Sequence, residues 1–76
     1  MKEILEIMIK SLVEDKDSVS IDEVAQNSEI KYEVRVNEKD MGRVIGKRGK
    51  IAQSIRTVMK AIAVKEDKKV SIEFID

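Results

Sequence analysis

The hydrophobic residues of this chain change their spacing three times, and the order of those spacings limits its possible folds. Over Lys2 to Glu14 they recur every three or four positions, which predicts a helix with one wide buried face. From Ile30 to Val36 apolar and polar residues alternate, which predicts a strand. The helical spacing returns between Met41 and Ala63, and the alternation returns from Val70 to Phe74. Both helices and strands are therefore expected.

A shorter alternation precedes the strict one and predicts a further strand. Its apolar residues are Val19, Ile21 and Val24, and the polar turn Gln26-Asn27-Ser28 separates it from the strand at Ile30. Two strands joined by so short a turn should form an antiparallel hairpin. The second strand and the closing strand are joined through helices, so these two can lie parallel in one mixed sheet, with the helices on one face. The other face should be unusually exposed to water.

Two consecutive helices are expected between the second and the last strand. The segment Asn37-Glu38-Lys39-Asp40 predicts the start of a helix, because Asn or Asp can cap the exposed N–H groups and acidic residues suit the positive end of the helix dipole. The short first helix should end at Gly46, which can close a helix because it lacks a Cβ. Its inward residues are expected to be Met41, Val44 and Ile45. The second helix, from about Lys50 to Ala63, carries an apolar stripe of Ile51, Ile55, Val58, Met59 and Ile62.

The resulting element order is helix-strand-strand-helix-helix-strand. This order predicts an α+β fold in which a three-stranded mixed sheet is covered by three helices. No internal repeat or linker is visible, so one domain is expected over residues 1–76.

Composition excludes most kinds of catalytic chemistry. The 76 residues include no Cys and no His, which removes zinc sites, thiol or Ser-His nucleophiles, imidazole acid-base chemistry and disulfides. A chain this short buries only about 60% of the surface that its unfolded form exposes, so it holds one thin core and no deep cavity. The neighbouring acids Asp22 and Glu23 are a candidate carboxylate pair for an enzymatic site, but solvated surface charge explains them without further assumption. We therefore expect no enzyme, no catalytic or metal-binding residues and no cofactor.

The first residues and the apolar runs argue against secretion and membrane insertion. Met1-Lys2-Glu3-Ile4-Leu5-Glu6 interrupts its hydrophobic stretch with acids, which a signal peptide would lack. The longest apolar runs are only a few residues, too short to span a membrane. A cytoplasmic protein without a membrane anchor is expected.

The formal charge is zero, but it is distributed unevenly. The 15 basic and 15 acidic side chains fall into three blocks. Residues 1–38 hold five basic and ten acidic side chains, residues 39–60 hold seven and one, and residues 61–76 hold three and four. The net charges are therefore −5, +6 and −1. The positive block favours a polyanionic partner. The alternative is that its residues only form a solvated helix face.

The segment Gly46-Lys47-Arg48-Gly49 joins the two consecutive helices inside the positive block. Its glycines allow a polyanion backbone to approach closely, while the N-terminus of the following helix presents peptide N–H groups and the positive end of its dipole. Two glycines around a turn also occur for purely steric reasons. Here the apolar residues Val44, Ile45 and Ile51 connect the turn to the core, which favours a phosphate-binding loop. It is not a P-loop, which is longer and ends in Lys followed by Ser or Thr.

The motif Gly42-Arg43-Val44-Ile45-Gly46-Lys47-Arg48-Gly49 resembles the signature of KH domains, RNA-binding modules whose GxxG loop clamps four backbone nucleotides. The element order resembles the type II arrangement of this domain. With Asp40-Met41-Gly42 and Ile55-Arg56-Thr57-Val58, the whole chain is similar to the small stand-alone bacterial KH proteins of the KhpA (YlqC) family.

That resemblance implies single-stranded RNA binding in the cytoplasm. It also implies self-association as a homodimer, and pairing with a larger KH protein of the KhpB (Jag, EloR) type. The processes that it implies are post-transcriptional regulation, RNA chaperone-like activity and a link to cell-envelope growth and cell shape.

The resemblance also assigns the RNA-binding residues. Four form the phosphate clamp, two are its apolar supports and the floor of the groove, and two are adjacent basic residues. In that order they are Gly46, Lys47, Arg48 and Gly49, then Ile45 and Ile51, then Arg43 and Lys50. Arg56 and Lys60 would extend the positive surface. The aromatic residues Tyr32 and Phe74 are expected in the core, as are Met41 and Met59.

Other functions remain open. The chain could be an interaction module that docks a larger KH-family partner, with nucleic-acid binding secondary, or it could bind single-stranded DNA through the same backbone contacts. Ile62, Val64 and the apolar side of the second central helix are candidates for a dimer surface or simply for the core.

Overall fold

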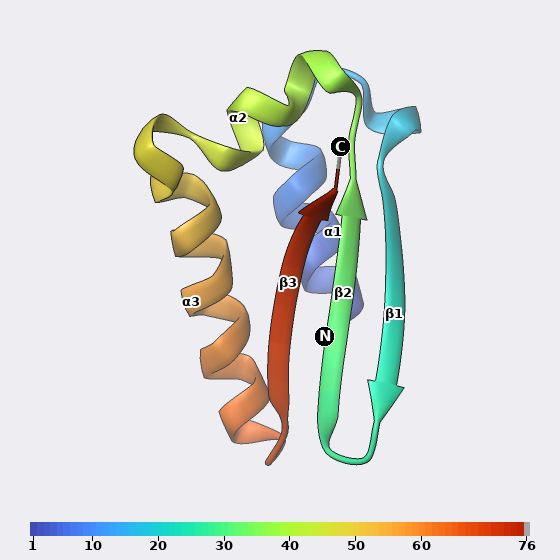
Figure 1. Ribbon diagram of the computed structural model, residues 1–76, viewed down its shortest axis with the longest axis vertical. Coiled ribbons are helices and arrows are strands. Elements are labelled where there is room, and N and C mark those ends of the chain that lie inside the picture. Colours follow the sequence, from blue (N-terminus) through green and yellow to red (C-terminus); the bar gives the residue numbers. More distant parts are fainter. Residues whose placement is uncertain (76) are drawn as a thin grey trace.

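The computed structural model describes residues 1–75 and contains the predicted elements in the predicted order. Helix α1 (Lys2–Leu12) is followed by a 3-10 turn (Lys16–Ser18), strands β1 (Ser20–Gln26) and β2 (Glu29–Arg35), a second 3-10 turn (Glu38–Asp40), helix α2 (Met41–Ile45), a third 3-10 turn (Lys47–Gly49), helix α3 (Lys50–Lys65) and strand β3 (Lys69–Ile75). The prediction of an α+β fold is confirmed (Figure 1).

The strands form one mixed sheet in the order β1-β2-β3. β1 pairs with β2 antiparallel and β2 pairs with β3 parallel, as the connections predict. Gln26 and Glu29 face each other at the end of the hairpin, and between them Asn27 has a φ of 54°, a conformation that Asn tolerates well. The other end of the turn is held by Lys69, whose N–H donates to the Ser28 carbonyl at 2.8 Å. β2 is therefore the central strand and β3 is an edge strand.

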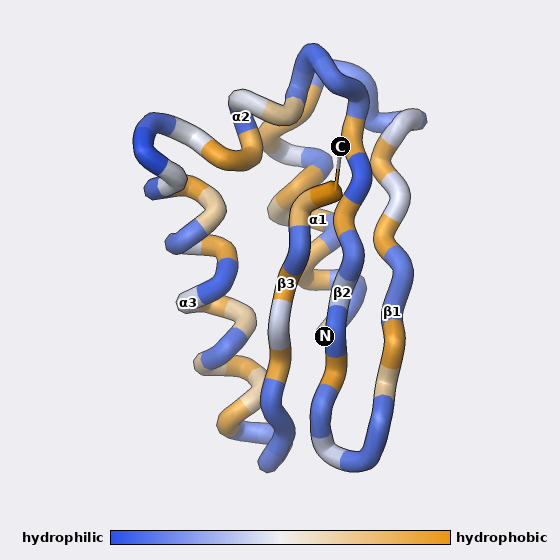
Figure 2. The backbone as a smooth tube through the Cα atoms, in the orientation of Figure 1, coloured by the Kyte–Doolittle hydropathy of each residue, from blue (hydrophilic) through white to orange (hydrophobic). Residues whose placement is uncertain are grey.

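The helices cover one face of this sheet. In Figure 1, α1 lies behind the strands and α3 lies along β3, and Figure 2 shows the alternation of apolar and polar residues along β2 and β3. The apolar side chains of β2 that face the helices, Ile30, Tyr32 and Val34, are buried with Leu5 and Ile9 of α1. The residues between them in β2 are exposed or half-buried on the open face. The expected two-layer arrangement, with one solvated sheet face, is confirmed.

Two predictions of buried side chains are wrong. Ile45 was expected to face inward, but 37% of it is exposed, and Val58 is 44% exposed. Successive helical residues point about 100° apart at 3.6 residues per turn, and in each case the neighbour, Val44 or Met59, is the fully buried one. The buried positions of α3 are Ala52, Ile55, Met59 and Ala63, so two small residues complete its inner face together with two large ones. Ile51 and Ile62 lie at the margins of this stripe and are partly buried.

The aromatic residues pack as expected. Tyr32 is fully buried in the core, and Phe74 is partly buried against it. The Tyr32 hydroxyl has no hydrogen-bond partner within residues 1–75. Burial raises the pKa of Tyr32 well above its usual value, and the nearby Glu23 carboxylate adds to the increase. Met59 is buried and Met41 packs against the edge of the core, which confirms both predictions.

Within residues 1–75, no helix is both long enough and apolar enough to cross a membrane.

Candidate nucleic-acid interface

The segment between α2 and α3 forms a tight turn with glycine at two positions of positive φ. α2 ends at Gly46, whose φ is 73° and ψ 177° and whose N–H donates to the Gly42 carbonyl at 2.9 Å. Gly49 also has a φ of 73°, and its N–H donates to the Gly46 carbonyl at 3.2 Å. Between them Arg48 has a φ of 56°. These positive φ angles turn the chain sharply, so α3 begins at Lys50 with its N-terminus beside the loop.

Gly46 is also required by close packing. A Cβ at this position would lie 2.6 Å from Cγ1 of Ile51, far inside normal contact distance. At Gly49 a Cβ would meet nothing within 4 Å, so its conformation alone favours glycine there. Ile51 thus lies directly against the first glycine of the loop, as its predicted role of apolar support requires, while Ile45 on the other side remains partly exposed.

The cations of the loop are available for a ligand. Lys47, Arg48 and Lys50 are exposed and have no ion-pair partner within residues 1–75. No side chain caps the N-terminus of the 16-residue helix α3. Because the first N–H groups of a helix have no intrahelical acceptor, they carry partial positive charge and attract anions. The loop therefore combines three unpaired cations with an uncapped helix N-terminus.

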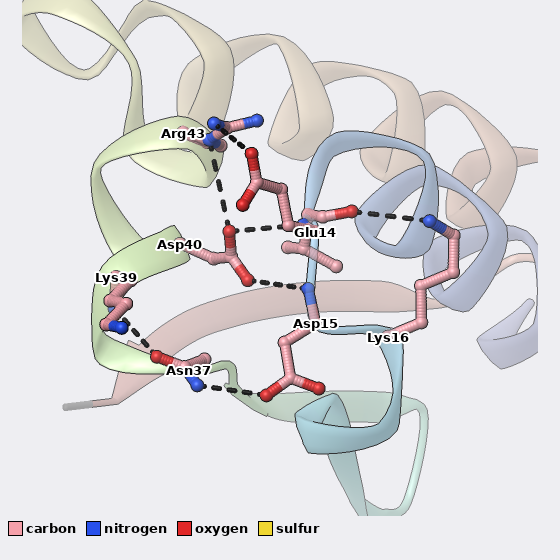
Figure 3. Close-up of polar contacts among 8 residues, drawn as sticks. Glu14, Asp15, Lys16, Asn37, Lys39, Asp40 and Arg43 are labelled. Carbon is pink, nitrogen blue, oxygen red and sulfur yellow. Dashed lines mark hydrogen bonds and ion pairs between the residues drawn. The ribbon is translucent and has the colours of Figure 1, made fainter.

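Arg43 is placed differently from the other predicted cations. Its guanidinium pairs with Glu14 at 2.7 Å and approaches the Asp40 carboxylate at 3.9 Å (Figure 3). The pairing with Glu14, 29 residues earlier, occupies one end of the guanidinium. In the free protein Arg43 therefore belongs to a network that positions α2.

Asp40 is the centre of that network. Only 2% of it is exposed, and its two carboxylate oxygens accept the backbone N–H groups of Glu14 and Asp15 at 3.1 and 3.0 Å (Figure 3). Asn37 caps the turn before α2, since its side chain accepts the Lys39 N–H at 2.9 Å and donates to Asp15. Hydrogen bonds from Ser18 and Asn37 hold the pKa of Asp15 below its usual value. The end of α1 is thereby fixed to the start of α2, and with it to the loop.

A groove lies between α3 and β3. A cavity of about 240 Å³ in it is lined by Arg56, Lys60, Val70, Ser71 and Ile72. Arg56 crosses the groove: its Nε–H donates to the Ile72 carbonyl at 3.3 Å, and its guanidinium carbon lies 5.4 Å from the centroid of the Phe74 ring. The edge of β3 therefore contributes main-chain polar groups to this surface.

Sequence reasoning identified the basic residues of α3 but not the contribution of β3. Ser71 and the Ile72 carbonyl carry no motif, because any edge strand presents unpaired main-chain groups. The missing information was the strand order, which places β3 at the edge beside α3.

The acidic pair considered as an enzymatic site is separated by the sheet. Asp22 lies on the open face, where its carboxylate pairs with Arg35 at 2.9 Å, and successive residues of a strand point to opposite faces. Both acids are exposed.

Known proteins resemble this chain over its full length. The family model described as "KhpA/KhpB, KH domain" matches residues 2–74. RNA-binding protein KhpA of Clostridium perfringens is 52% identical over 75 residues, which is 99% of this chain and 100% of that protein. The same values hold for RNA-binding protein KhpA of Clostridium acetobutylicum, and its counterpart in Caldanaerobacter subterraneus is 45% identical over 75 residues, with the same coverage.

The fold also occurs within a larger protein. The crystal structure of Aquifex aeolicus Era bound to GDP and aluminium fluoride matches with a TM-score of 0.68 and 20% identity, over 95% of this chain and 28% of that one. This similarity concerns the fold alone. The family match and the full-length relatives together show that the chain belongs to the KhpA/KhpB family of KH domains.

Proposed function

We propose that this chain binds single-stranded RNA and holds the RNA backbone with the loop Gly46-Lys47-Arg48-Gly49. The observation that carries the proposal is the loop itself: two glycines at positive φ place unpaired cations beside the uncapped N-terminus of α3. The relatives named RNA-binding protein KhpA support the choice of RNA.

The loop acts by geometry and charge. Its glycine backbone lets a phosphate approach the peptide N–H groups, and Lys47 and Arg48 add electrostatic attraction on either side of that phosphate. Lys50 extends the positive surface into the first turn of α3. No bond is made or broken, so the protein acts on RNA by binding alone, in keeping with relatives that are named as RNA-binding proteins.

The two isoleucines next to the loop provide its apolar side. The partial exposure of Ile45 leaves apolar surface where a nucleotide can pack, and Ile51 supports the loop from beneath. Arg43 holds α2 to α1 through Glu14, and the end of its guanidinium that Glu14 leaves free is available to a phosphate. Single-stranded RNA suits this narrow surface because its unstacked bases can turn into the groove beside β3.

The test is fluorescence anisotropy of a labelled single-stranded RNA pool. The double variant Lys47→Asp/Arg48→Asp should lose most of the affinity at low salt. Lys2→Asp/Lys16→Asp makes the same change in net charge on the α1 side of the molecule and should retain most of it. Circular dichroism establishes that both are folded. If both variants bind like the wild type, or the wild type binds no RNA, the proposal is wrong.

A second function, docking of a protein partner, is favoured by exposed apolar side chains. A shallow groove of about 250 Å³ between α1 and α3 is lined by Met8, Ser11, Leu12, Ile51, Ser54, Ile55 and Val58. Val64, near the end of α3, is 75% exposed. A second copy of this chain, or a KH protein of the KhpB type, could cover these residues in the cytoplasm, and two linked weak sites would raise RNA affinity without new contacts.

Sedimentation equilibrium tests this second function. The wild type should sediment as a dimer, or as a heterodimer with an added KhpB-type protein, and Val58→Lys and Val64→Lys should shift the equilibrium towards monomer. A wild type that stays monomeric alone and with that partner would contradict it.

A further inference from the structure

A second group of cations lies at the far end of α3 from the loop. Lys60 is in the last turns of this helix, Lys68 is in the turn that follows and Lys69 is the first residue of β3. These three distal lysines are exposed and have no ion-pair partner within residues 1–75. At 1.5 Å per residue, Lys60 lies about 15 Å along α3 from Lys50. The loop and the distal lysines therefore occupy opposite ends of one helix (Figure 1).

The distal lysines line one cavity. It measures about 360 Å³, at the lower end of the range of about 300–1,000 Å³ for ligand pockets. Its apolar lining residues are Ala63, Val64 and Val70, and the one acidic residue that the structure describes in its lining is Glu29. Glu66 and Asp67, in the adjoining turn, are not among the lining residues. Positive charge therefore dominates a surface that also offers apolar contacts.

Main-chain hydrogen bonds fix the positions of Lys68 and Lys69. Asp67 has a φ of 56°, and after this turn the Lys68 N–H donates to the Ala63 carbonyl at 2.8 Å. The Lys69 N–H donates to the Ser28 carbonyl, also at 2.8 Å. The first of these bonds also occupies a carbonyl that would otherwise add to the negative end of the α3 dipole. Because both bonds use the main chain, the two lysine side chains can be replaced without removing either bond.

This cavity adjoins the groove beside Arg56. Lys60 and Val70 line both of them. Gln53, Arg56 and Lys60 follow one another at spacings of three and four residues, so they share one face of α3. That face connects the loop end of the helix to the distal lysines. The continuity favours an RNA strand that already lies on the loop over an acidic protein segment as the occupant of the cavity.

Resting on the proposed function, we propose that RNA longer than four nucleotides continues along α3 and that its phosphates contact Lys60, Lys68 and Lys69. The loop of a KH domain clamps four backbone nucleotides, so a tetranucleotide held there leaves the distal lysines empty. Each further phosphate that meets a lysine releases counterions and adds about 0.7 to the log-log salt slope of a single strand. The distal lysines thus form a second backbone-binding site, which acts only on longer RNA.

The test compares a labelled tetranucleotide and a labelled dodecanucleotide of uridine by fluorescence anisotropy, between about 50 and 200 mM salt. In the wild type the slope for the dodecanucleotide should be steeper by about 2, from three contacts at about 0.7 each. Lys68→Gln/Lys69→Gln should remove about 1.4 of this difference and weaken dodecanucleotide binding about tenfold at the lowest salt, with tetranucleotide binding unchanged. Circular dichroism checks that this variant is folded.

Lys2→Gln/Lys16→Gln is the matched control, because it makes the same change in net charge on the α1 side and should leave the difference between the two slopes as in the wild type. The inference is overturned, and the proposed function left intact, if the two lengths have equal slopes in the wild type. The same holds if Lys68→Gln/Lys69→Gln binds the dodecanucleotide like the wild type, or weakens both lengths equally. Loss of polyglutamate binding by that variant, with RNA binding unchanged, would assign the surface to an acidic protein and also overturn the inference. Absence of binding to both RNAs by the wild type overturns the proposed function itself.

Discussion

Substitution of the two loop glycines by alanine should have clearly different costs. Gly46 has φ 73° and ψ 177°, a region that is populated almost only by glycine and costs other residues about 1–3 kcal/mol. The added Cβ would also lie 2.6 Å from Ile51 Cγ1 and 2.9 Å from Ile51 Cβ. Overpacking of this kind costs about 1–3 kcal/mol more. Gly46→Ala should therefore lower the free energy of unfolding by about 4 kcal/mol.

Gly49→Ala is the matched control. Its φ is 73° and its ψ is 14°, the ordinary left-handed region, and its Cβ would meet nothing within 4 Å. The cost of that conformation for an L residue is about 1–2 kcal/mol. Urea unfolding followed by circular dichroism measures both losses. At a slope of about 1 kcal/mol/M, the two midpoints should differ by about 2–3 M.

A double-mutant cycle isolates the contact from the backbone strain. Ile51→Ala removes Cγ1 and Cδ1, two of the three atoms that a Cβ at Gly46 would strike. Gly46→Ala should therefore lower the free energy of unfolding by at least about 1 kcal/mol less in the Ile51→Ala background than in the wild type. Equal losses for Gly46→Ala and Gly49→Ala, together with a coupling near zero, would refute the reasoning about how this loop is built.

Three further perturbations follow from the same geometry. Asp40→Asn keeps only one side-chain oxygen, so it leaves one of two partly buried backbone N–H groups without an acceptor and should lower stability by about 1–3 kcal/mol in urea unfolding; an unchanged midpoint would contradict the role of Asp40. Tyr32→Phe removes a buried hydroxyl that has no partner, so stability at neutral pH should stay the same or rise. Because the folded pKa of Tyr32 is raised, the stability that its neutral hydroxyl contributes is fully present below the unfolded pKa near 10.0 and is lost as the pH rises towards the folded pKa, so stability should fall more steeply above about pH 10 in the wild type than in Tyr32→Phe; parallel pH curves would contradict the shift. RNA affinity should fall with salt, and removal of both Lys47 and Arg48 charges should reduce the log-log slope by about 1.4, while a slope equal to that of the wild type would mean that neither contacts phosphate.

The order of elements could be predicted from the sequence because it depends on spacing alone. Alternation at Ile30, Tyr32 and Val34 defines a strand wherever it lies, and the polar turn before it defines the hairpin. The GxxG loop was recognisable because glycine at positive φ is a local requirement, met at Gly46 and Gly49 without reference to the rest of the fold.

The incorrect predictions concern neighbours on helices. Both Val44 and Ile45 are apolar, and so are Val58 and Met59, but only the tertiary fold decides which of each pair faces the core. The small residues Ala52 and Ala63 were overlooked because a weakly hydrophobic side chain adds little to an apolar stripe, although close helix packing needs it.

The sequence predicts which residues of the site are charged, but not which of them form ion pairs or hydrogen bonds with distant residues. Arg43 and Lys50 look alike in the sequence, yet Arg43 pairs with Glu14, 29 residues earlier and just after α1, while Lys50 has no ion-pair partner within residues 1–75. The contact between Arg56 and the Ile72 carbonyl depends on β3 being the edge strand. Such contacts between distant segments arise only when the chain is folded.

In the proposed complex, RNA lies across the loop and along the groove between α3 and β3. An NMR titration with an isotope-labelled protein and a tetranucleotide of cytosine tests this placement. The largest amide shifts are expected from Gly46 to Ile51, with smaller ones at Ser71 and Ile72, and the open face of the sheet should be unaffected. Shifts that centre on the open sheet face or on the groove between α1 and α3, with an unchanged loop, would contradict the account.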